Sequence, residues 1–303
     1  MKTKIVIAGG TGFVGQYLHK KFTASGYEVI IISRNKNHVN WDNTTLITEA
    51  LENADMLINL AGKSVDCRYN EKNKREIYNS RIDTTKILGD AIHCCKNPPS
   101  LWINSSTATI YRHAEDRPMT ESTGEIGTGF SVNVATNWEK AFFDFKLPET
   151  RQVALRMAIV LGGDGGVMKP LKNLVNLGLG GKQGSGKQMF SWIHIEDLYR
   201  IITFIQQHNE LNGVINTASP NPVNNKTLMQ LLRKNMKTAF GLPAPVWLLK
   251  MGAVIIKTET ELILKSRWVI PERLSAAGFQ FQYPCIDTAL KQILSDGTQI
   301  SIQ

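Results

Sequence analysis

The 303-residue sequence lacks any apolar run that approaches the ~20 residues of a membrane-spanning helix. It also leaves no room for a signal peptide, because Met1 and Lys2 pass directly into an expected strand. There are only four cysteines, and the adjacent pair Cys94 and Cys95 suits neither a metal site nor an ordinary disulfide. We therefore expect reduced thiols in a cytoplasmic protein that holds no metal and binds no membrane.

Internal repeats and low-complexity tracts are absent as well. Hydrophobic residues make up 42% and charged residues 20% of the chain, which excludes a disordered protein and is typical of a globular one. The net charge of +9 would suit a nucleic-acid surface. However, the lysines and arginines are scattered, and no basic helix with interleaved aromatic residues occurs. The charge therefore favours phosphate-bearing small ligands over nucleic acid.

The sequence does contain a glycine-rich turn within residues 4–15, KIVIAGGTGFVG. The apolar run before the turn predicts a buried strand of a parallel sheet, and the periodicity after it predicts a helix up to Ala24. Gly9 permits a sharp turn, Gly12 lets a pyrophosphate approach the backbone, and Gly15 lets the helix pack close to the sheet. The helix N-terminus attracts phosphate groups. The predicted pyrophosphate-binding residues are Gly9, Gly12, Phe13, Val14 and Gly15; the alternative is a plain strand–helix turn.

The second expected strand, residues 27–33, ends without the acidic residue that would bind the ribose hydroxyls of NAD. Ser33 and Arg34 stand there instead, and the guanidinium of Arg34 could pair with the 2′-phosphate of NADP. The sequence thus favours NADP(H) over NAD(H) as the cofactor. The alternative is that Arg34 is a solvated loop residue.

Strands and helices continue to alternate up to residue 165. We expect a short strand at 45–48, strands at 55–60, 100–106 and 152–161, and helices at 71–95 and 128–147. This alternation predicts an α/β protein with a Rossmann-type doubly wound parallel sheet. Leu60, Ala61 and Gly62 follow one strand and Ser105 ends another, so we expect these four residues to line the cofactor site.

After residue 165 the pattern changes. Residues 178–187 hold five glycines but lack the spacing of a phosphate-binding loop, so we expect a flexible loop over the active site. Strands are expected at 190–194 and 214–217, and helices at 195–208 and 226–237. We predict a Rossmann domain from residues 1–165 and about 190–218, and a smaller mixed α+β substrate lobe from residues 166–189 and 219–303.

Three motifs together resemble the extended short-chain dehydrogenase/reductase superfamily, of the NAD-dependent epimerase/dehydratase type. They are GGTGFVG in the first turn, NLAG at 59–62 and SSTATIY at 105–111. Further segments are similar to one subgroup, the epimerase-family proteins with a C-terminal domain of unknown function, which are called nucleoside-diphosphate sugar epimerases: residues 80–92, 178–198, 216–225 and 270–281. The resemblance implies a nicotinamide cofactor, a nucleotide sugar or other carbonyl compound as substrate, and a monomer or homodimer.

The Tyr-x-x-x-Lys pair that the superfamily uses as its acid/base is missing from the expected helix, FSVNVATNWEKAFF at 130–143. Alignment on Glu139 places Ser131 at the tyrosine position and Ala135 at the lysine position. Serine is a far weaker acid than a phenol, and alanine carries no charge. Tyr17 and Lys21 have the right spacing, but they lie on the first helix, so we interpret them as coincidence.

Two catalytic candidates remain. Thr107 falls on the family's catalytic Ser/Thr position, where its hydroxyl would bind a substrate oxygen. Arg81 falls where the family has an asparagine, and its guanidinium could bind a substrate carboxylate or phosphate, or polarise a carbonyl. We interpret Glu139 as a helix-surface acid or an acid behind the site. Structural roles are expected for Tyr111, Glu121, Trp138, Trp192 and His194.

Two functions follow from these observations. The first is an oxidoreductase or epimerase that acts on a nucleotide sugar or another carbonyl compound with a non-standard acid/base. The second is a non-catalytic NADPH-binding sensor or interaction protein that retains the fold of an enzyme. The missing pair favours the second, whereas Thr107 and Arg81 favour the first.

Overall fold

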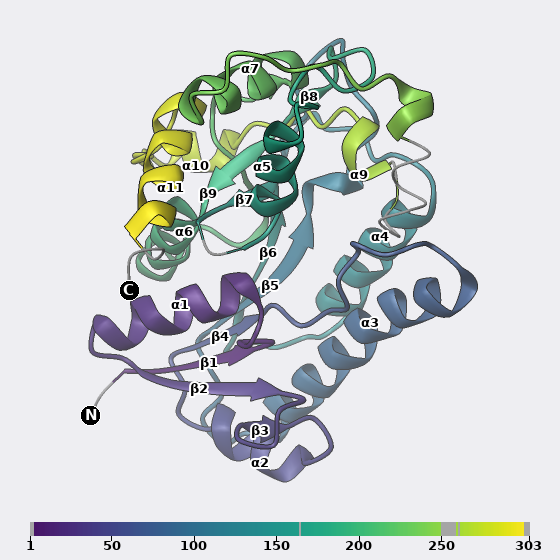
Figure 1. Cartoon of the computed structure of the whole chain (residues 1–303). Coiled ribbons are helices and arrows are strands. Elements are labelled where there is room, and N and C mark those ends of the chain that lie inside the picture. The colour runs from purple at the N-terminus through teal and green to yellow at the C-terminus, as the bar shows by residue number, and fades with distance from the viewer. Residues whose placement is uncertain (1–2, 164, 250–258, 260, 300–303) are drawn as a thin grey trace.

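A parallel sheet forms the centre of the molecule in the computed structural model, which describes residues 3–163, 165–249, 259 and 261–299 (Figure 1). The strand order is β10-β6-β5-β4-β1-β2-β3, and every neighbouring pair is parallel. The strands are β1 (Lys4–Ala8), β2 (Glu28–Ser33), β3 (Val39–Asn40), β4 (Met56–Asn59), β5 (Leu101–Thr107), β6 (Arg151–Met157) and β10 (Gly213–Thr217). The order reverses between β1 and β4, so the predicted Rossmann-type doubly wound sheet is confirmed.

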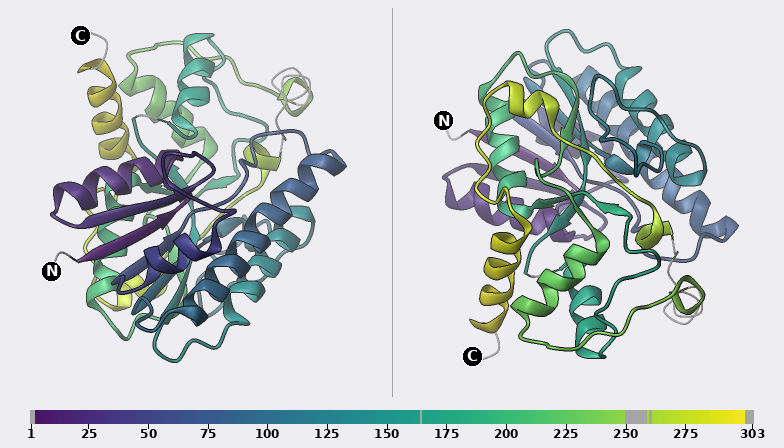
Figure 2. Two further views of the ribbon diagram at one scale, coloured as in Figure 1. Left: turned by 90° about the horizontal axis from the view of Figure 1, so that it is seen from below. Right: turned by 90° about the horizontal axis from the view of Figure 1, so that it is seen from above.

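Helices cover both faces of this sheet because successive side chains of each strand point to opposite faces. On one face, Ile5 and Ile7 of β1 pack against α1 (Phe13–Ala24) and α6 (Ile195–Gln207). On the other face, Val6 and Ala8 belong to a core shared with α2 (Thr44–Leu51), α3 (Glu71–Cys94) and α4 (Phe130–Phe143). Figure 2 shows α3 and α4 side by side along that face.

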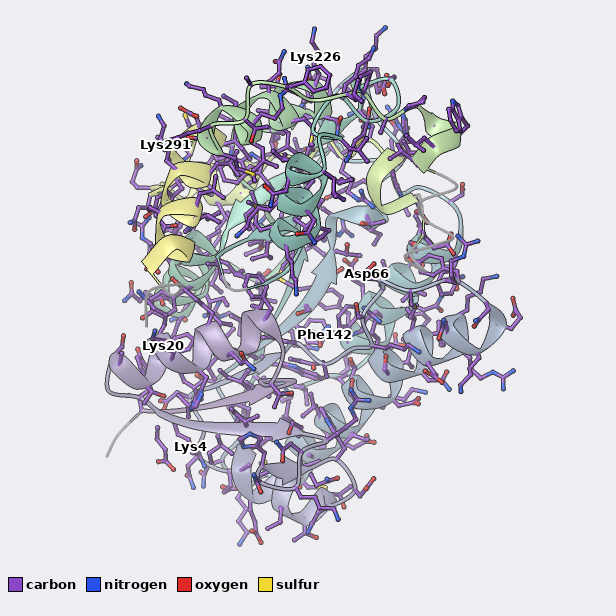
Figure 3. The ribbon with its side chains drawn as sticks, viewed as in Figure 1. Lys4, Lys20, Asp66, Phe142, Lys226 and Lys291 are labelled. Carbon is purple, nitrogen blue, oxygen red and sulfur yellow. The ribbon has the colours of Figure 1, made fainter. Side chains whose placement is uncertain are left out.

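The aromatic core of the second face is centred on Trp102 of β5. Its ring meets the ring of Phe142 edge-on, with 4.7 Å between the ring centroids. Both side chains are fully buried. Phe142, labelled in Figure 3, therefore fixes α4 against the sheet. This packing determines which side of α4 is left to face the carboxyl ends of the strands.

The C-terminal part of the chain forms a second cluster of elements beyond the ends of β5 and β6 (Figure 1). Two small sheets lie here, β7 (Ile159–Leu161) with β9 (Trp192–His194), and β8 (Met189–Phe190) with β11 (Val223–Asn224). The helices of this cluster are α5 (Met168–Asn176), α7 (Asn225–Asn235) and α11 (Ile286–Gln299). The short η1 (Ala108–Ile110) contacts α4 and β6, α10 (Glu272–Ala276) packs against β10, and α9 (Glu261–Leu264) precedes α10 in the chain. In Figure 3, Lys226 and Lys291 mark this part of the molecule, and Lys4 and Lys20 mark the sheet region. The predicted domain boundaries stay a prediction.

Three sequence predictions about the fold are wrong. Residues 45–48 are not a strand but part of α2, where the Asn43 side chain caps the helix by accepting a hydrogen bond from the N–H of Leu46 at 3.0 Å. The strand predicted at 152–161 breaks after Met157, because β6 stays in the large sheet while β7 pairs with β9. The predicted strand at 190–194 likewise divides between β8 and β9.

The glycine-rich loop at 178–187 also differs from its prediction. Its backbone pairs with a neighbouring segment of the C-terminal part, since Gly181 N–H donates to Leu242 and Gly184 N–H donates to Ala244. None of its residues lines the large cavity described below. The loop therefore packs against C-terminal elements and does not cover the cavity.

The four cysteines, all within the described ranges, form no disulfide in the structure. Within the described ranges, no three metal-ligating side chains gather into a possible ion site, and no helix is both long and apolar enough to cross a bilayer.

Candidate functional site

A cavity of about 400 Å³ opens at the carboxyl ends of β1, β4, β5 and β6. It lies beside the point where the strand order reverses, which is where open α/β sheets bind ligands. It contains eleven of the thirteen predicted site residues. These are Gly9, Gly12, Phe13, Val14, Gly15, Leu60, Ala61, Gly62, Arg81, Ser105 and Thr107.

The glycine turn shapes one end of this cavity. Gly9 has φ +78°, and a Cβ there would lie 2.8 Å from the backbone nitrogen of Ala61. A Cβ on Gly15 would lie 2.6 Å from the Cα of Gly10, so α1 can pack this close only because residue 15 is glycine. Gly12 is different, because its Cβ would meet only the Gly9 oxygen at 3.7 Å. The turn therefore leaves open space at Gly12.

The N-terminus of α1 faces this open space with its backbone N–H groups uncapped. Gly12 is the N-cap, no side chain accepts from the first turn, and that turn holds no acidic residue. Free N–H groups and the positive end of the helix dipole favour a bound anion. The cradle thus fits the pyrophosphate of a dinucleotide.

The loop after β4 forms an adjacent wall. The Asn59 side chain accepts from the N–H of Ala61 at 3.0 Å and donates to Asn104 at 2.7 Å. These buried hydrogen bonds fix the backbone from Leu60 to Gly62, and the small residues Ala61 and Gly62 leave room for an adenosine group.

Ser33 and Arg34 are the two predicted residues that do not line the cavity. Ser33 is buried, and its hydroxyl accepts a hydrogen bond from the N–H of Asn35 at 3.0 Å. Arg34 is exposed after the end of β2, with no hydrogen bond or ion pair among the described residues. Its guanidinium is free for a ligand, and its assignment to a 2′-phosphate stays a prediction.

Arg81 lies on α3 and reaches the cavity from below the loop after β4. Its guanidinium donates to the carbonyl oxygens of Ile77 at 2.8 Å and Lys63 at 3.2 Å, and it stacks over the Trp138 ring at 5.2 Å. No carboxylate pairs with it among the described residues. Burial lowers the pKa of Arg81 to about 10, so it remains a cation at neutral pH. A half-buried cation that lines a cavity without a carboxylate partner is suited to an anionic ligand.

Thr107 ends β5 at the same cavity. Its hydroxyl oxygen accepts from the N–H of Thr109 at 3.1 Å, which leaves its own proton available to a ligand. Thr107 and Arg81 are thus both placed at the site, although their catalytic role stays a prediction.

The two positions that carry the missing acid/base pair also face the cavity. Ser131 and Ala135 lie one turn apart on α4, and both line it. The hydroxyl of Ser131 donates to Glu261 of α9 at 3.1 Å. Part of the C-terminal region therefore contacts a residue of the cavity wall, at the position that we predict for the tyrosine of the acid/base pair.

Glu139 is not a helix-surface acid. It is buried behind the cavity, where Arg156 of β6 donates to its two oxygens at 2.8 and 2.7 Å and Ser106 donates at 2.5 Å. Since Ser106 lines the cavity, this pair orients one hydroxyl of its wall. The alternative prediction, an acid behind the site, agrees with this position.

The other titratable candidates have structural partners. The Tyr111 hydroxyl donates to Asn216 at 2.9 Å, and Glu121 accepts from the backbone N–H of Asn216 at 2.8 Å. His194 caps α6 and bonds Gln292 at 2.8 Å. Tyr17 and Lys21, the coincidental pair, both bind Glu196 of α6. None of these side chains lines the cavity.

Sequence reasoning missed several residues of the cavity wall, and Tyr69 is the most important of them. It lies in the polar loop between β4 and α3, close in sequence to Asp66, which Figure 3 labels. The loop has neither a hydrophobic period nor a motif. The sequence feature that could have indicated Tyr69 is its position, within ten residues of the segment 60–62 that we expect to lie against the adenosine.

A doubly wound sheet whose glycine turn opens onto a cavity at its switch point defines a dinucleotide-binding protein of the Rossmann type. Comparison with known proteins narrows this class. Residues 5–130 match the NAD dependent epimerase/dehydratase family, and residues 244–293 match a domain of unknown function, DUF1731. Human epimerase family protein SDR39U1 is 33% identical over 96% of this chain and 100% of its own length. The chain therefore belongs to the NAD dependent epimerase/dehydratase family, among the epimerase family proteins that carry DUF1731.

Other relatives extend the comparison. Epimerase family protein YfhF of Bacillus subtilis is 31% identical over 96% of this chain and 98% of its own length. The crystal structure of the human protein with NADPH superimposes with a TM-score of 0.88, covering 97% of this chain and 100% of that one. The nucleoside-diphosphate sugar epimerase of Corynebacterium glutamicum is 27% identical with a TM-score of 0.77, and this chain covers 62% of it. The NADPH in the human structure agrees with the predicted cofactor.

Proposed function

We propose that this protein is an NADP(H)-dependent oxidoreductase or epimerase that acts on the carbonyl group of an anionic small molecule, such as a nucleotide sugar. The observation that carries the proposal is the half-buried guanidinium of Arg81, which has no carboxylate partner among the described residues and lines the same cavity as Thr107. A cation that is partly removed from water and has no counter-charge favours the binding of an anionic substrate.

Each part of the cavity has a role in this proposal. The glycine turn and the N-terminus of α1 bind the pyrophosphate, residues 60–62 lie against the adenosine, and Arg34 binds the 2′-phosphate. When bound, NADPH supplies a hydride. Thr107 donates a hydrogen bond to the carbonyl oxygen of the substrate, and Arg81 binds its carboxylate or phosphate.

The cofactor assignment is tested by fluorescence titration of the purified protein with NADPH and with NADH. In Arg34→Ala we expect NADPH affinity to fall by about tenfold or more, because a charge-assisted contact contributes ~1.5–3 kcal/mol, while NADH affinity changes less than about twofold. Lys36→Ala is the matched control, since Lys36 is an exposed cation in the same loop. Equal losses for both cofactors would show that Arg34 does not select NADP.

The activity is tested by NADPH oxidation with a UDP-4-keto sugar and with phenanthrenequinone as carbonyl probes. We expect Thr107→Val to abolish turnover and to leave NADPH affinity nearly intact, because only the substrate loses a hydrogen bond. Arg81→Met should raise KM for the anionic probe far more than for the neutral quinone. Equal effects on the two probes would contradict an anion-binding role for Arg81.

A second candidate function is a non-catalytic NADPH-binding sensor or interaction protein. It is favoured by Ser131 and Ala135, which supply neither a phenol nor an ammonium group at the cavity. Selective NADPH binding without oxidation by any carbonyl probe would support this second function over the first.

A further inference from the structure

A phenol does reach the cavity, from an unexpected part of the chain. Tyr69 lines it together with Thr107, Arg81 and Ser131. Its ring packs edge-on against Phe130 at the start of α4, with 5.1 Å between the centroids. The side chain thus approaches α4 from the opposite wall.

Few titratable side chains line this cavity. Within the described residues they are Lys63, Tyr69 and Arg81. The ammonium of Lys63 is held by Asn73 at 2.8 Å and by the Glu76 carboxylate. Arg81 remains charged at neutral pH and donates to two backbone carbonyls. Tyr69 is therefore the cavity-lining acid that is both neutral and able to donate a proton.

The position of Tyr69 is fixed by the C-terminal part of the chain. Its backbone N–H donates to the Glu259 side chain at 2.8 Å, and Arg68 lies 3.6 Å from the same carboxylate. These contacts join the loop after β4 to the segment that leads into α9. The ring contact with Phe130 then fixes the side chain on its other side.

A chain of polar groups leads from the phenol to the surface. Ser131 lines the cavity together with Tyr69, and its hydroxyl lowers the pKa of the phenol. Ser131 in turn donates to Glu261 at 3.1 Å, and the Glu261 side chain is 38% exposed. A proton can therefore pass from solvent through a carboxylate and a hydroxyl to the phenol.

The groups that face Tyr69 determine its protonation state. Burial raises the pKa of Tyr69; the Ser131 hydroxyl and the Arg267 guanidinium lower it, whereas Glu261 and Cys67 raise it. The pKa of Tyr69 stays above its ordinary value, so the phenol is fully protonated at neutral pH. A protonated phenol is the form that an acid catalyst needs when a carbonyl group is reduced.

We propose that Tyr69 is the proton donor of this site, and that Ser131 and Glu261 return its proton from solvent. This inference rests on the proposed function. As the carbonyl carbon gains a hydride from NADPH, the C=O π bond becomes an O–H bond with the proton of the Tyr69 hydroxyl. Glu261 then takes a proton from water and passes it to Ser131 as Ser131 passes its own proton to the phenolate, which restores the Tyr69 hydroxyl. The balance is one hydride and one proton consumed per carbonyl reduced.

The first test compares Tyr69→Phe with Tyr78→Phe. Tyr78 is a half-buried tyrosine on α3 that does not line the cavity, which makes it a matched control. With phenanthrenequinone and NADPH, we expect Tyr69→Phe to lower kcat by about 10²- to 10⁴-fold, the usual range for loss of a general acid. NADPH affinity should change less than about twofold in both variants. Full turnover in Tyr69→Phe would overturn the assignment while leaving the proposed function intact.

The second test needs no turnover. The protein is labelled with tyrosine carrying ¹³C at Cζ, and the pH titration of each signal is followed by NMR with and without NADP⁺. The Tyr69 signal is the one lost in Tyr69→Phe, and its midpoint should lie above the ordinary value of a tyrosine. Ser131→Ala should raise the midpoint and Glu261→Gln should lower it. A Tyr69 signal whose titration midpoint is unchanged by both substitutions would overturn the proposed proton path.

The two tests separate two failures. If the wild-type protein oxidises no NADPH with either carbonyl probe, the proposed function fails, and the role of Tyr69 fails with it. If the wild type is active and the NMR titration or the Tyr69→Phe kinetics disagree with the expectation, only the role of Tyr69 fails.

Discussion

The buried ion pair of Arg156 and Glu139 shows how single residues hold the wall of the cavity. The two side chains are 12% and 11% exposed, and two charge-assisted hydrogen bonds join them. The Ser106 hydroxyl completes the group from the cavity side. Because both charges have left water, each depends on the other for its solvation.

We expect Glu139→Gln to lower the free energy of unfolding by about 3–5 kcal/mol, because it leaves the Arg156 guanidinium buried without a counter-charge. Urea unfolding measures this loss. Glu149→Gln is the control, since Glu149 is an exposed acid in the loop after α4 and should change stability by less than ~0.5 kcal/mol. Similar small losses in both variants would show that the pair contributes no net stability.

The adjacent residues Cys94 and Cys95 differ in their exposure to solvent, and we expect them to differ in reactivity. Burial and the neighbouring Glu52 carboxylate raise the pKa of the Cys95 thiol to about 11, whereas Cys94 is exposed at the end of α3. A thiol with this pKa is only about 0.1% thiolate at pH 8, and the thiolate is the reactive form. We expect iodoacetamide to modify Cys94 much faster than Cys95, as measured by peptide mass spectrometry. Equal rates would contradict the raised pKa of the half-buried Cys95 thiol.

At the scale of elements, the contact between α1 and the turn before it depends on a missing side chain. A Cβ at Gly15 would lie within 2.8 Å of three backbone atoms of Gly10, and backbone cannot move aside as a flexible side chain can. We expect Gly15→Ala to destabilise the protein by about 1–3 kcal/mol, as overpacking does, despite the better helix propensity of alanine. Thermal unfolding measures this change. Thr23→Ala, at an exposed position of α1, should have little effect, and a stable Gly15→Ala would contradict the tight approach.

Helices and strands with a clear hydrophobic periodicity were predictable from sequence. Elements whose bounds depend on pairing with distant parts of the chain were not. The apolar runs of β1 and β4 and the long α3 were all located closely. Residues 45–48 were not, because two threonines favour a strand by propensity while the Asn43 cap and the buried face of α2 favour a helix. No local sequence feature predicts the break after Met157, because the break results from the pairing of β7 with β9, which is distant in sequence.

At the scale of the whole molecule, the site combines segments that are distant in sequence. The glycine turn, the loop after β4 and the end of β5 could be assigned from motifs, because local chemistry fixes their roles. Tyr69 could not, because its position depends on Glu259 and on the contact with Phe130. Motifs in the sequence therefore located most residues of the cavity wall around the glycine turn, whereas they did not locate Tyr69.

Because the cavity is built from the ends of four strands, ligand binding should stabilise the whole fold. We expect NADPH at about 100 times its Kd to raise the free energy of unfolding by about 2.7 kcal/mol, and NADH at the same concentration to raise it less. Thermal melts with each nucleotide measure this effect. An unchanged melting temperature with NADPH would contradict a preformed site.

The open space at Gly12 has a practical consequence. Gly12 adopts φ −79° and ψ 171°, a backbone conformation that any residue accepts, and its missing Cβ faces almost nothing. Gly12→Ala should therefore leave the stability of the protein without nucleotide unchanged, and it should weaken only the binding of a pyrophosphate. A strain that carries Gly12→Ala would therefore show whether the cellular role of the protein needs the bound nucleotide. A phenotype that matches gene deletion would mean that the nucleotide is required. A normal phenotype would mean that the folded protein is sufficient without it.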